Sequence, residues 1–175
     1  EEAASAAGED AARAAAGWEI ARAGAPAYRY ANQGGVFARA DVDDLEEFAA
    51  TRRAMRRLGF ARAGADGALA LAAALLHLGE CVFHADQRAD GTEGAALDGD
   101  GAGAALARAA RLLGVADEGA LLGAMTTRAV EASGERYVLA LSAEHAAHAR
   151  DALAKEVDGR LFDWLVHHVN EGVKA

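Results

Sequence analysis

The most constraining feature of the sequence is an apolar pattern near its C-terminal end that fits one long helix. Apolar side chains recur there every four residues, at Leu153, Val157, Leu161 and Leu165. This spacing places them on one face of an α-helix, and Ser142 followed by Glu144 is typical of a helix start. The pattern predicts a single stiff helix over 142–170, roughly 43 Å long. Gly159 is its weak point, since an interior glycine costs up to about 1 kcal/mol relative to alanine.

The preceding sequence also favours helices. Apolar periodicity and acidic first turns predict them over 41–58, 66–78, 104–113 and 116–125, and the alanine-rich stretch 3–23 favours one or two more. Asp43 and Glu46 have capping-box spacing at the start of the first of these helices. The helix over 66–78 is apolar almost all round, which predicts a core position. Residues 81–83 suggest a short strand, and the glycine- and aspartate-rich residues 85–103 predict a loop.

The period changes after residue 125. Residues 126–131 and 136–141 alternate between polar and apolar side chains around Ala132-Ser-Gly134, which predicts a β-hairpin. The sequence therefore predicts a mainly α fold, in which a helical subdomain carries one small β-hairpin and a long C-terminal helix.

Composition narrows the classes of partner. The 175 residues carry a formal net charge of −9, which disfavours binding to nucleic acid or to an anionic membrane surface. No apolar run reaches the roughly 20 residues that span a bilayer, and Glu1-Glu2 does not begin a secretory signal. A single cysteine agrees with a reducing cytosol. We expect a cytoplasmic protein without nucleic-acid or membrane partners, and we interpret the arginines of the helix over 41–58 as a solvated, dipole-matched face.

Several short motifs suggest chemistry that the surrounding residues do not complete. A P-loop needs a Gly-Lys pair to hold phosphates, and none occurs. Residues 98–103 resemble the start of an EF-hand loop but lack its third carboxylate and its bidentate glutamate, and Ser133 lacks the Gly-x-Ser-x-Gly context of a nucleophile. Two histidine pairs lie about five turns apart on one helix and cannot converge on zinc: His145 with His148, and His167 with His168. No catalytic, cofactor-binding or metal-binding residue is predicted in this chain.

A set of short motifs follows one order along the chain. They are Tyr30-Ala-Asn-Gln-Gly34, Thr51-Arg52 with Ala54-Met55, Gly59-Phe60, Leu75-Leu-His-Leu-Gly79, Thr126-Thr-Arg128, Asp151-Ala-Leu-Ala-Lys155 and Leu161-Phe-Asp-Trp-Leu-Val166. In this order and spacing they closely resemble the motor (head) domain of myosins, the ATP-driven motors that move on actin. The resemblance covers about residues 28–170, and residues 1–27 fit it loosely as a lead-in.

The resemblance implies that the chain is an internal fragment of a motor domain with a P-loop NTPase-type fold, from the upper actin-binding subdomain. Residues 28–125 would form a helical bundle, 126–141 an actin-facing hairpin, and 142–170 the helix that runs toward the nucleotide switches. The parent motor uses ATP and Mg²⁺. Because the P-loop, switch I and switch II are all missing, we expect this chain to bind neither ligand and to be inactive alone. The implied partners are the actin filament and the remainder of the motor, in the cytoplasmic cytoskeleton.

The resemblance also implies which residues contact actin. The family carries an acidic or phosphorylatable residue sixteen positions before its Asp-Ala-Leu-Ala-Lys run, and counting back from Asp151 gives Glu135. A glutamate there supplies a permanent negative charge without phosphorylation. The implied actin-binding residues of the hairpin are Arg128, Glu131, Glu135 and Arg136. The alternative interpretation is that Glu135 is an ordinary exposed turn residue.

Two other functions stay open at this point. The chain could be a non-catalytic, motor-derived helical module kept for protein interaction alone, or an unrelated alanine-rich helical scaffold, which requires the ordered motifs to be a coincidence. The departures from the family pattern are a glutamate, Glu80, where asparagine is usual, and a less helix-favouring stretch at Glu156-Val-Asp-Gly159. The full transcript separates a motor from a module, because only a motor needs the P-loop and both switches.

Overall fold

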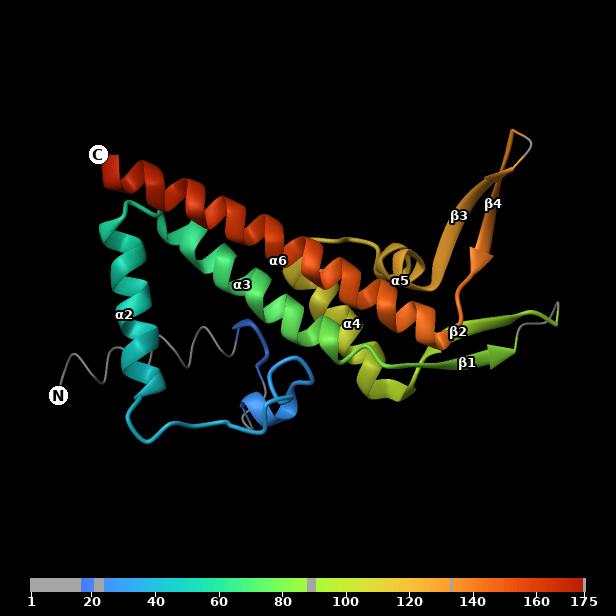
Figure 1. Cartoon of the computed structure of the whole chain (residues 1–175), viewed down its shortest axis with the longest axis horizontal. Helices are drawn as coiled ribbons and strands as arrows, with labels where there is room; N and C mark the ends of the chain where they lie inside the picture. The colour runs from blue at the N-terminus through green and yellow to red at the C-terminus, as the bar shows by residue number, and fades with distance from the viewer. Residues whose placement is uncertain (1–16, 21–23, 88–90, 133, 175) are drawn as a thin grey trace.

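A computed structural model describes residues 17–20, 24–87, 91–132 and 134–174. Most of the predicted helical stretch 3–23, and Ser133, lie outside these residues. The described chain is mostly helical, with two antiparallel hairpins (Figure 1). The elements are η1 (Ala25–Ala27), α2 (Asp44–Arg57), α3 (Arg62–Gly79), β1 (Phe83–Gln87), β2 (Glu93–Leu97), α4 (Gly99–Leu113), α5 (Glu118–Thr126), β3 (Thr127–Ala132), β4 (Glu135–Ala140) and α6 (Ala143–Lys174).

The predicted long helix is confirmed as the single, unbroken helix α6. It has 32 residues, which corresponds to about 48 Å. Ser142 precedes it, and its hydroxyl accepts a hydrogen bond from the amide of His145 at 3.3 Å, which satisfies one of the amides that a helix start leaves open. The helix continues through Gly159 and extends four residues beyond the predicted end at 170.

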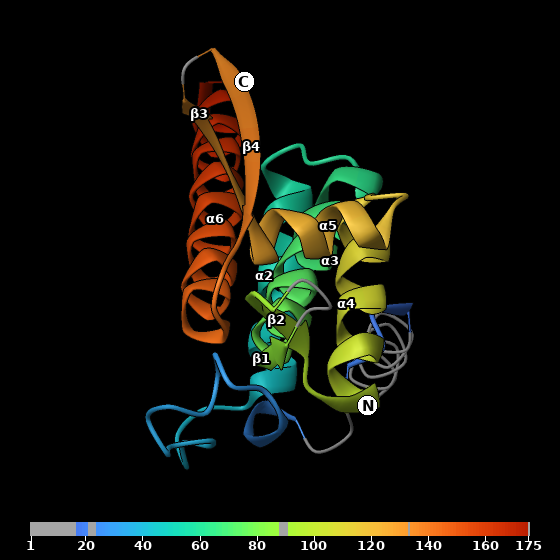
Figure 2. The same ribbon diagram turned by 90° about the vertical axis from the view of Figure 1, so that its right-hand side faces the viewer.

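Helix α3 lies between α4 and α6, which pack on its opposite sides (Figure 2). The prediction of a core position for this segment is confirmed, although the helix begins at Arg62, before the predicted start. Several of its buried side chains are small, and short side chains let neighbouring helices approach closely; they are Ala65, Ala68, Ala73 and Ala74. The main core cluster joins α3 to α4 and α5 through Leu78, Leu106, Leu121 and Met125.

A second core cluster, at the other end of the molecule, is built around an aromatic contact. Phe60, which follows α2, is 6% exposed, and its ring centroid lies 5.6 Å from that of Trp164 in an edge-to-face arrangement. The imidazole of His168 lies over the Trp164 ring, with centroids 4.3 Å apart. Edge-to-face and offset ring pairs stabilise a fold beyond their buried area. Two of the motifs that carry the family resemblance, Gly59-Phe60 and the Leu-Phe-x-Trp run, therefore meet in the core.

Helix α2 starts three residues later than predicted and is only partly packed. Asp43 is its N-cap, because its carboxylate accepts hydrogen bonds from the amides of Leu45 at 2.9 Å and Glu46 at 3.1 Å. Of the predicted apolar face, Met55 is buried, whereas Leu45 is 42% exposed. The capping prediction was therefore correct, and the apolar side chain of the first turn remains exposed.

The prediction of one small hairpin, with a loop over 85–103, was wrong. Residues 83–87 and 93–97 pair as a second antiparallel hairpin, β1–β2, and α4 already begins at Gly99. The ends of the hairpin are anchored from outside the segment, since Phe83 and Leu97 pack against the main core cluster. The amide of Asp98 also donates to the carbonyl of Val82 at 2.8 Å. These contacts are non-local, and they outweigh the weak strand propensity of the glycine and aspartate residues.

The glycines of α6 provide a stability test with opposite signs. A Cβ at Gly159 meets no other atom within 4 Å, so Gly159→Ala is expected to stabilise the protein by roughly 0.5–1 kcal/mol through helix propensity alone. A Cβ at Gly172 would lie 2.3 Å from the carbonyl oxygen of Leu58, so Gly172→Ala is expected to displace the last turn and lower stability. Urea unfolding followed by circular dichroism measures both, and a destabilising Gly159→Ala would contradict the continuity of α6 at that point.

Candidate functional site

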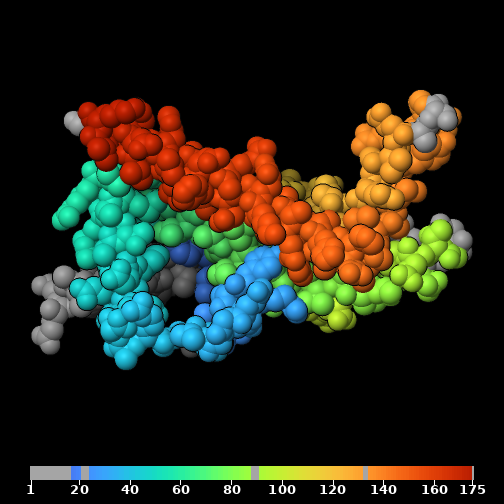
Figure 3. All heavy atoms as spheres, in the orientation of Figure 1, coloured from blue at the N-terminus to red at the C-terminus, as the bar shows by residue number. Residues whose placement is uncertain are grey.

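The hairpin predicted from the sequence is present as β3–β4, and it projects from the helical body. Strand register pairs Thr127 with Ala140 and Ala132 with Glu135. Figures 1 and 3 show it standing away from the helices, at the end of the molecule opposite α2. Val138 is 66% exposed and Tyr137, on the other face of the strand, is 47% exposed. A two-stranded ribbon open on both faces has little stability of its own. Both of its faces are accessible to a partner.

The four predicted site residues are all exposed and all lie on this ribbon. Residues two apart in a strand share a face, and directly paired residues share a face. From the register, Arg128 and Glu135 lie on one face, whereas Glu131 and Arg136 are paired directly opposite each other on the other face. The structure thus places an arginine and a glutamate on each face of one element, with Arg128 near the base of the ribbon and Glu135 beside its turn.

The charged side chains of the hairpin differ in whether they already form a hydrogen bond within the chain. Glu135 accepts a hydrogen bond from the Tyr137 hydroxyl at 2.6 Å, and this bond raises the pKa of the Tyr137 phenol above its ordinary value. Arg128, Glu131 and Arg136 form no ion pair with another described residue. Three of the four charges can therefore meet a partner without first breaking an internal bond.

Sequence reasoning missed the apolar surface of the same strand. Tyr137, Val138 and Leu139 are each more than two-fifths exposed, on a strand with no helix beneath it. Their position in the alternating segment 136–141 was visible in the sequence. The alternation predicted the strands of the hairpin but not the exposure of these three side chains. The candidate surface is therefore part charged and part apolar. Protein interfaces are likewise enriched in tyrosine and arginine relative to the rest of the surface.

The hairpin is joined to α6 by a short, bonded connection. The amide of Leu141 donates to the carbonyl of Thr126 at 2.8 Å, which extends the ladder to the base of the hairpin. The next residue, Ser142, immediately precedes α6. The hairpin therefore leads directly into a helix that reaches the far end of the molecule (Figure 1).

A buried network fixes the start of α6 against the end of α3. Arg150 is 6% exposed, and its guanidinium donates to the carbonyl of Cys81 at 3.0 Å and to that of Gly79 at 3.4 Å. It also pairs with Asp151 at 2.7 Å. Charge-assisted bonds of this kind are stronger than neutral ones, so the two carbonyls left open at the end of α3 are satisfied by a side chain of α6.

Tyr30 completes this network. Its hydroxyl donates to Asp151 at 2.5 Å, and its ring lies 5.7 Å from the Arg150 guanidinium carbon. A Cβ at Gly79 would lie 3.0 Å from that ring, so the ring packs directly on a position where glycine leaves room. Burial and the bond to Asp151 raise the pKa of the Tyr30 phenol to about 12. Three motifs that are far apart in sequence, those holding Tyr30, Gly79 and Asp151, therefore converge at one point.

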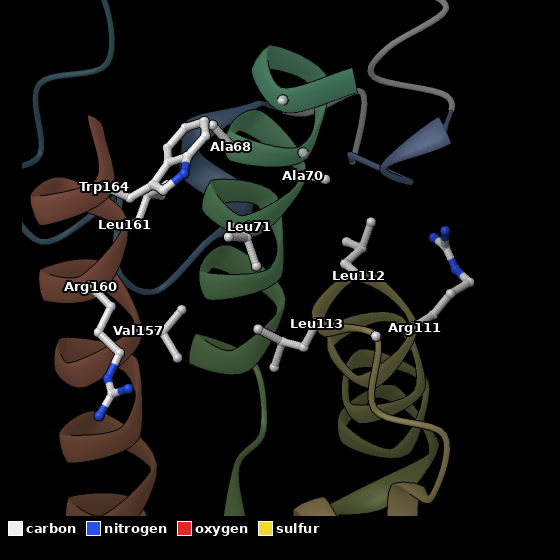
Figure 4. A pocket seen from close by; sticks show the side chains of 13 residues that line it. Ala68, Ala70, Leu71, Arg111, Leu112, Leu113, Val157, Arg160, Leu161 and Trp164 are labelled. Atoms are coloured by element: carbon white, nitrogen blue, oxygen red, sulfur yellow. The ribbon is translucent and has the colours of Figure 1, made fainter. Parts of the chain in front are cut away.

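An apolar groove between three helices has a different character. It has a volume of about 670 Å³ between α3, α4 and α6, and Leu71, Leu113 and Val157 converge on it (Figure 4). Its two charged residues are paired elsewhere, Arg111 with Glu19 and Arg160 with Glu156. The groove therefore offers mainly apolar contact.

Among the described residues, no group of three or more histidine, cysteine or acidic side chains is placed to hold a metal ion. None of the helices in the described ranges has the length and apolar character needed to cross a bilayer. The β3–β4 hairpin is therefore the candidate site that the geometry favours.

Comparison with known proteins gives consistent matches. The family model described as myosin head (motor domain) matches residues 11–175. Human unconventional myosin-Ib is 37% identical over 134 residues, which is 77% of this chain and 11% of that protein. Myosin-14 of Arabidopsis thaliana is 35% identical over 146 residues, 83% of this chain and 9% of that protein. Myosin heavy chain IB of Acanthamoeba castellanii is 35% identical over 147 residues, 84% of this chain and 12% of that protein. The chain thus spans between 9% and 12% of the length of these three relatives.

Proposed function

Because the chain belongs to the myosin head (motor domain) family, we propose that it is part of an actin-based, ATP-driven motor of the cytoskeleton. Within that motor we assign to this chain the contact with the actin filament and the coupling of that contact to the nucleotide site. The observation that supports the proposal is the β3–β4 hairpin, which is exposed on both faces and is connected to α6 by a short, hydrogen-bonded segment.

The proposed contact has an electrostatic part and an apolar part. Arg128 and Arg136 can pair with acidic groups of the filament, and Glu131 and Glu135 with basic ones. Exposed contacts of this kind contribute roughly 0.2–1 kcal/mol each and weaken with salt. The exposed side chains of Tyr137, Val138 and Leu139 add apolar area that salt does not screen.

The proposed coupling depends on the stiffness of α6. A helix of 32 residues held at its start by Arg150 and at its far end by the Phe60–Trp164 contact moves as one body. Coupling further requires a second, two-state element that responds to the nucleotide. We propose that this element, together with the ATP and Mg²⁺ sites, belongs to the remainder of the motor domain, because the sequence contains no Gly-Lys pair for a P-loop.

The test is co-sedimentation of the chain with filamentous actin at low salt, with charge changes at Glu135. We expect Glu135→Ala to weaken binding about twofold and Glu135→Lys about fivefold or more, as removal and reversal of one exposed charge predict. Glu47→Lys is the matched control, because it makes the same charge change on α2 at the opposite end of the molecule (Figure 1). Equal binding by the parent, both Glu135 variants and the control would overturn the assignment of the hairpin.

A further inference from the structure

We propose that a small cavity between the end of α2 and the start of α3 binds a phosphate group. The cavity has a volume of about 140 Å³ and is lined by Arg52, Arg56, Arg62 and Ala65. It lies at the end of the molecule opposite the β3–β4 hairpin (Figure 1), so the proposal is independent of actin binding.

The three arginines combine a fixed donor with two adaptable ones. The Arg52 side chain is 15% exposed and is held by an ion pair with Asp66. Arg62 lies on the other helix, 3.6 Å from the second carboxylate oxygen of Asp66, with its side chain 77% exposed. Arg56, one turn after Arg52 on α2, is exposed and forms no ion pair with another described residue. An anion entering the cavity would meet a preorganised guanidinium from Arg52 and two exposed ones from Arg56 and Arg62.

The charge of the cavity matches a dianion better than a single carboxylate. Asp66 is the one acidic group paired with these arginines, so two positive charges remain unmatched in a protein whose net charge is −9. A phosphate monoester carries about −1.5 to −2 at neutral pH, whereas a carboxylate carries one charge. The planar guanidinium also offers parallel N–H donors that fit phosphate oxygens in pairs.

Helix-dipole matching accounts for only part of this cluster. Arg56 and Arg57 lie in the last turn of α2, where a cation is favoured. Arg62 is the first residue of α3, where the positive end of the helix dipole disfavours a cation. The preceding residue, Ala61, provides no side-chain cap, so the first amides of α3 add to the positive potential there. A bound anion explains why an arginine stands at this position, although the arginines, rather than the helix end, carry the proposal.

The size of the cavity limits what it can hold. Pockets for organic ligands have volumes of roughly 300–1,000 Å³, and a water molecule occupies about 30 Å³. A cavity of about 140 Å³ therefore holds one phosphate group and not a nucleotide. Free phosphate and a phosphorylated side chain of another segment present the same chemistry to the three arginines.

The experiment is a calorimetric titration of the protein with inorganic phosphate, at an ionic strength held constant with chloride. Arg56→Gln and Arg62→Gln are each expected to weaken phosphate binding at least fivefold. Arg53→Gln and Arg57→Gln are the matched controls, since they remove the same charge from the same region but do not line the cavity, and they should change the affinity less than twofold. A parallel titration with phosphoserine amide distinguishes the two sources, because only a site open to a phosphorylated side chain will accept it.

Three results would overturn the proposal. They are the absence of phosphate binding by the parent, equal weakening by cavity and control variants, and acetate binding as tight as phosphate binding. Circular dichroism of each variant checks the fold, and both tested arginines are exposed. Arg56→Lys provides a second readout, because it keeps the charge and loses the paired donors, so it should weaken phosphate binding less than Arg56→Gln does.

Discussion

Replacing Arg150 by alanine is expected to destabilise the protein by roughly 3 kcal/mol, as the removal of one partner of a buried charge pair predicts. The guanidinium is the donor for the carbonyls of Gly79 and Cys81 and the partner of Asp151. Without it, two buried acceptors and one partly buried carboxylate lose their bonds together. Urea unfolding followed by circular dichroism measures the loss.

The control for this prediction is Arg160→Ala on the same helix. Arg160 pairs with Glu156 at 2.7 Å, but its side chain is 80% exposed, and exposed pairs contribute about 0–1 kcal/mol. Comparable losses for Arg150→Ala and Arg160→Ala would show that the network at the start of α6 does not hold this helix to α3.

The same network provides a second readout in the pH dependence of stability. Burial raises the pKa of Asp151, but the hydrogen bonds from Tyr30 and Arg150 outweigh burial, so the pKa lies below its ordinary value. A carboxyl group whose pKa is depressed on folding stabilises the protein above its ordinary pKa and loses that contribution as the pH falls through the folded value. The parent should therefore lose stability on acidification through this window, and Arg150→Ala should lose less, because the depression depends partly on Arg150.

Replacing Phe60 by alanine is expected to lower stability by roughly 3 kcal/mol, in the range for a buried aromatic side chain. Phe60 is 6% exposed and contacts both Trp164 and His168, so its removal leaves a void between the end of α2 and α6. Because Trp164 lines that void, its fluorescence emission should shift to longer wavelength as water enters. Urea unfolding and the emission spectrum of the folded variant measure the two effects.

Phe162→Ala is the matched control, since it also truncates a phenylalanine to alanine. Phe162 lies on α6, two residues before Trp164. Phe162 is 64% exposed, and surface substitutions usually change stability by less than about 0.5 kcal/mol. If the two variants lost similar stability, the aromatic cluster would not be the contact that closes this end of the molecule.

Local patterns in the sequence were sufficient for most of the helices and for one hairpin. The four-residue spacing from Leu153 to Leu165 predicted α6, and the Asp43 carboxylate predicted the cap of α2; both depend on contacts within one or two turns. The hairpin was predicted over 126–141, because its strands alternate around a glycine turn, and it is observed over 127–140. The motif order predicted the family, which the comparisons confirm.

Tertiary contacts decided the features that sequence reasoning missed. The strands of β1–β2 exist because Phe83 and Leu97 pack on helices that come from elsewhere in the chain. Likewise, the proposed phosphate cavity needs Arg62 of α3 to stand beside two arginines of α2.

The sequence by itself determined most of the helical segments, where the exposed hairpin begins and to which family the chain belongs, because these properties follow from spacing, capping and motif order along the chain. Only the tertiary structure brought Tyr30, Gly79 and Asp151 to one point and left both faces of the β3–β4 ribbon open. The physical reason is that burial and side-chain partners depend on distances in space between residues that lie up to 121 positions apart in sequence, and no local pattern contains those distances.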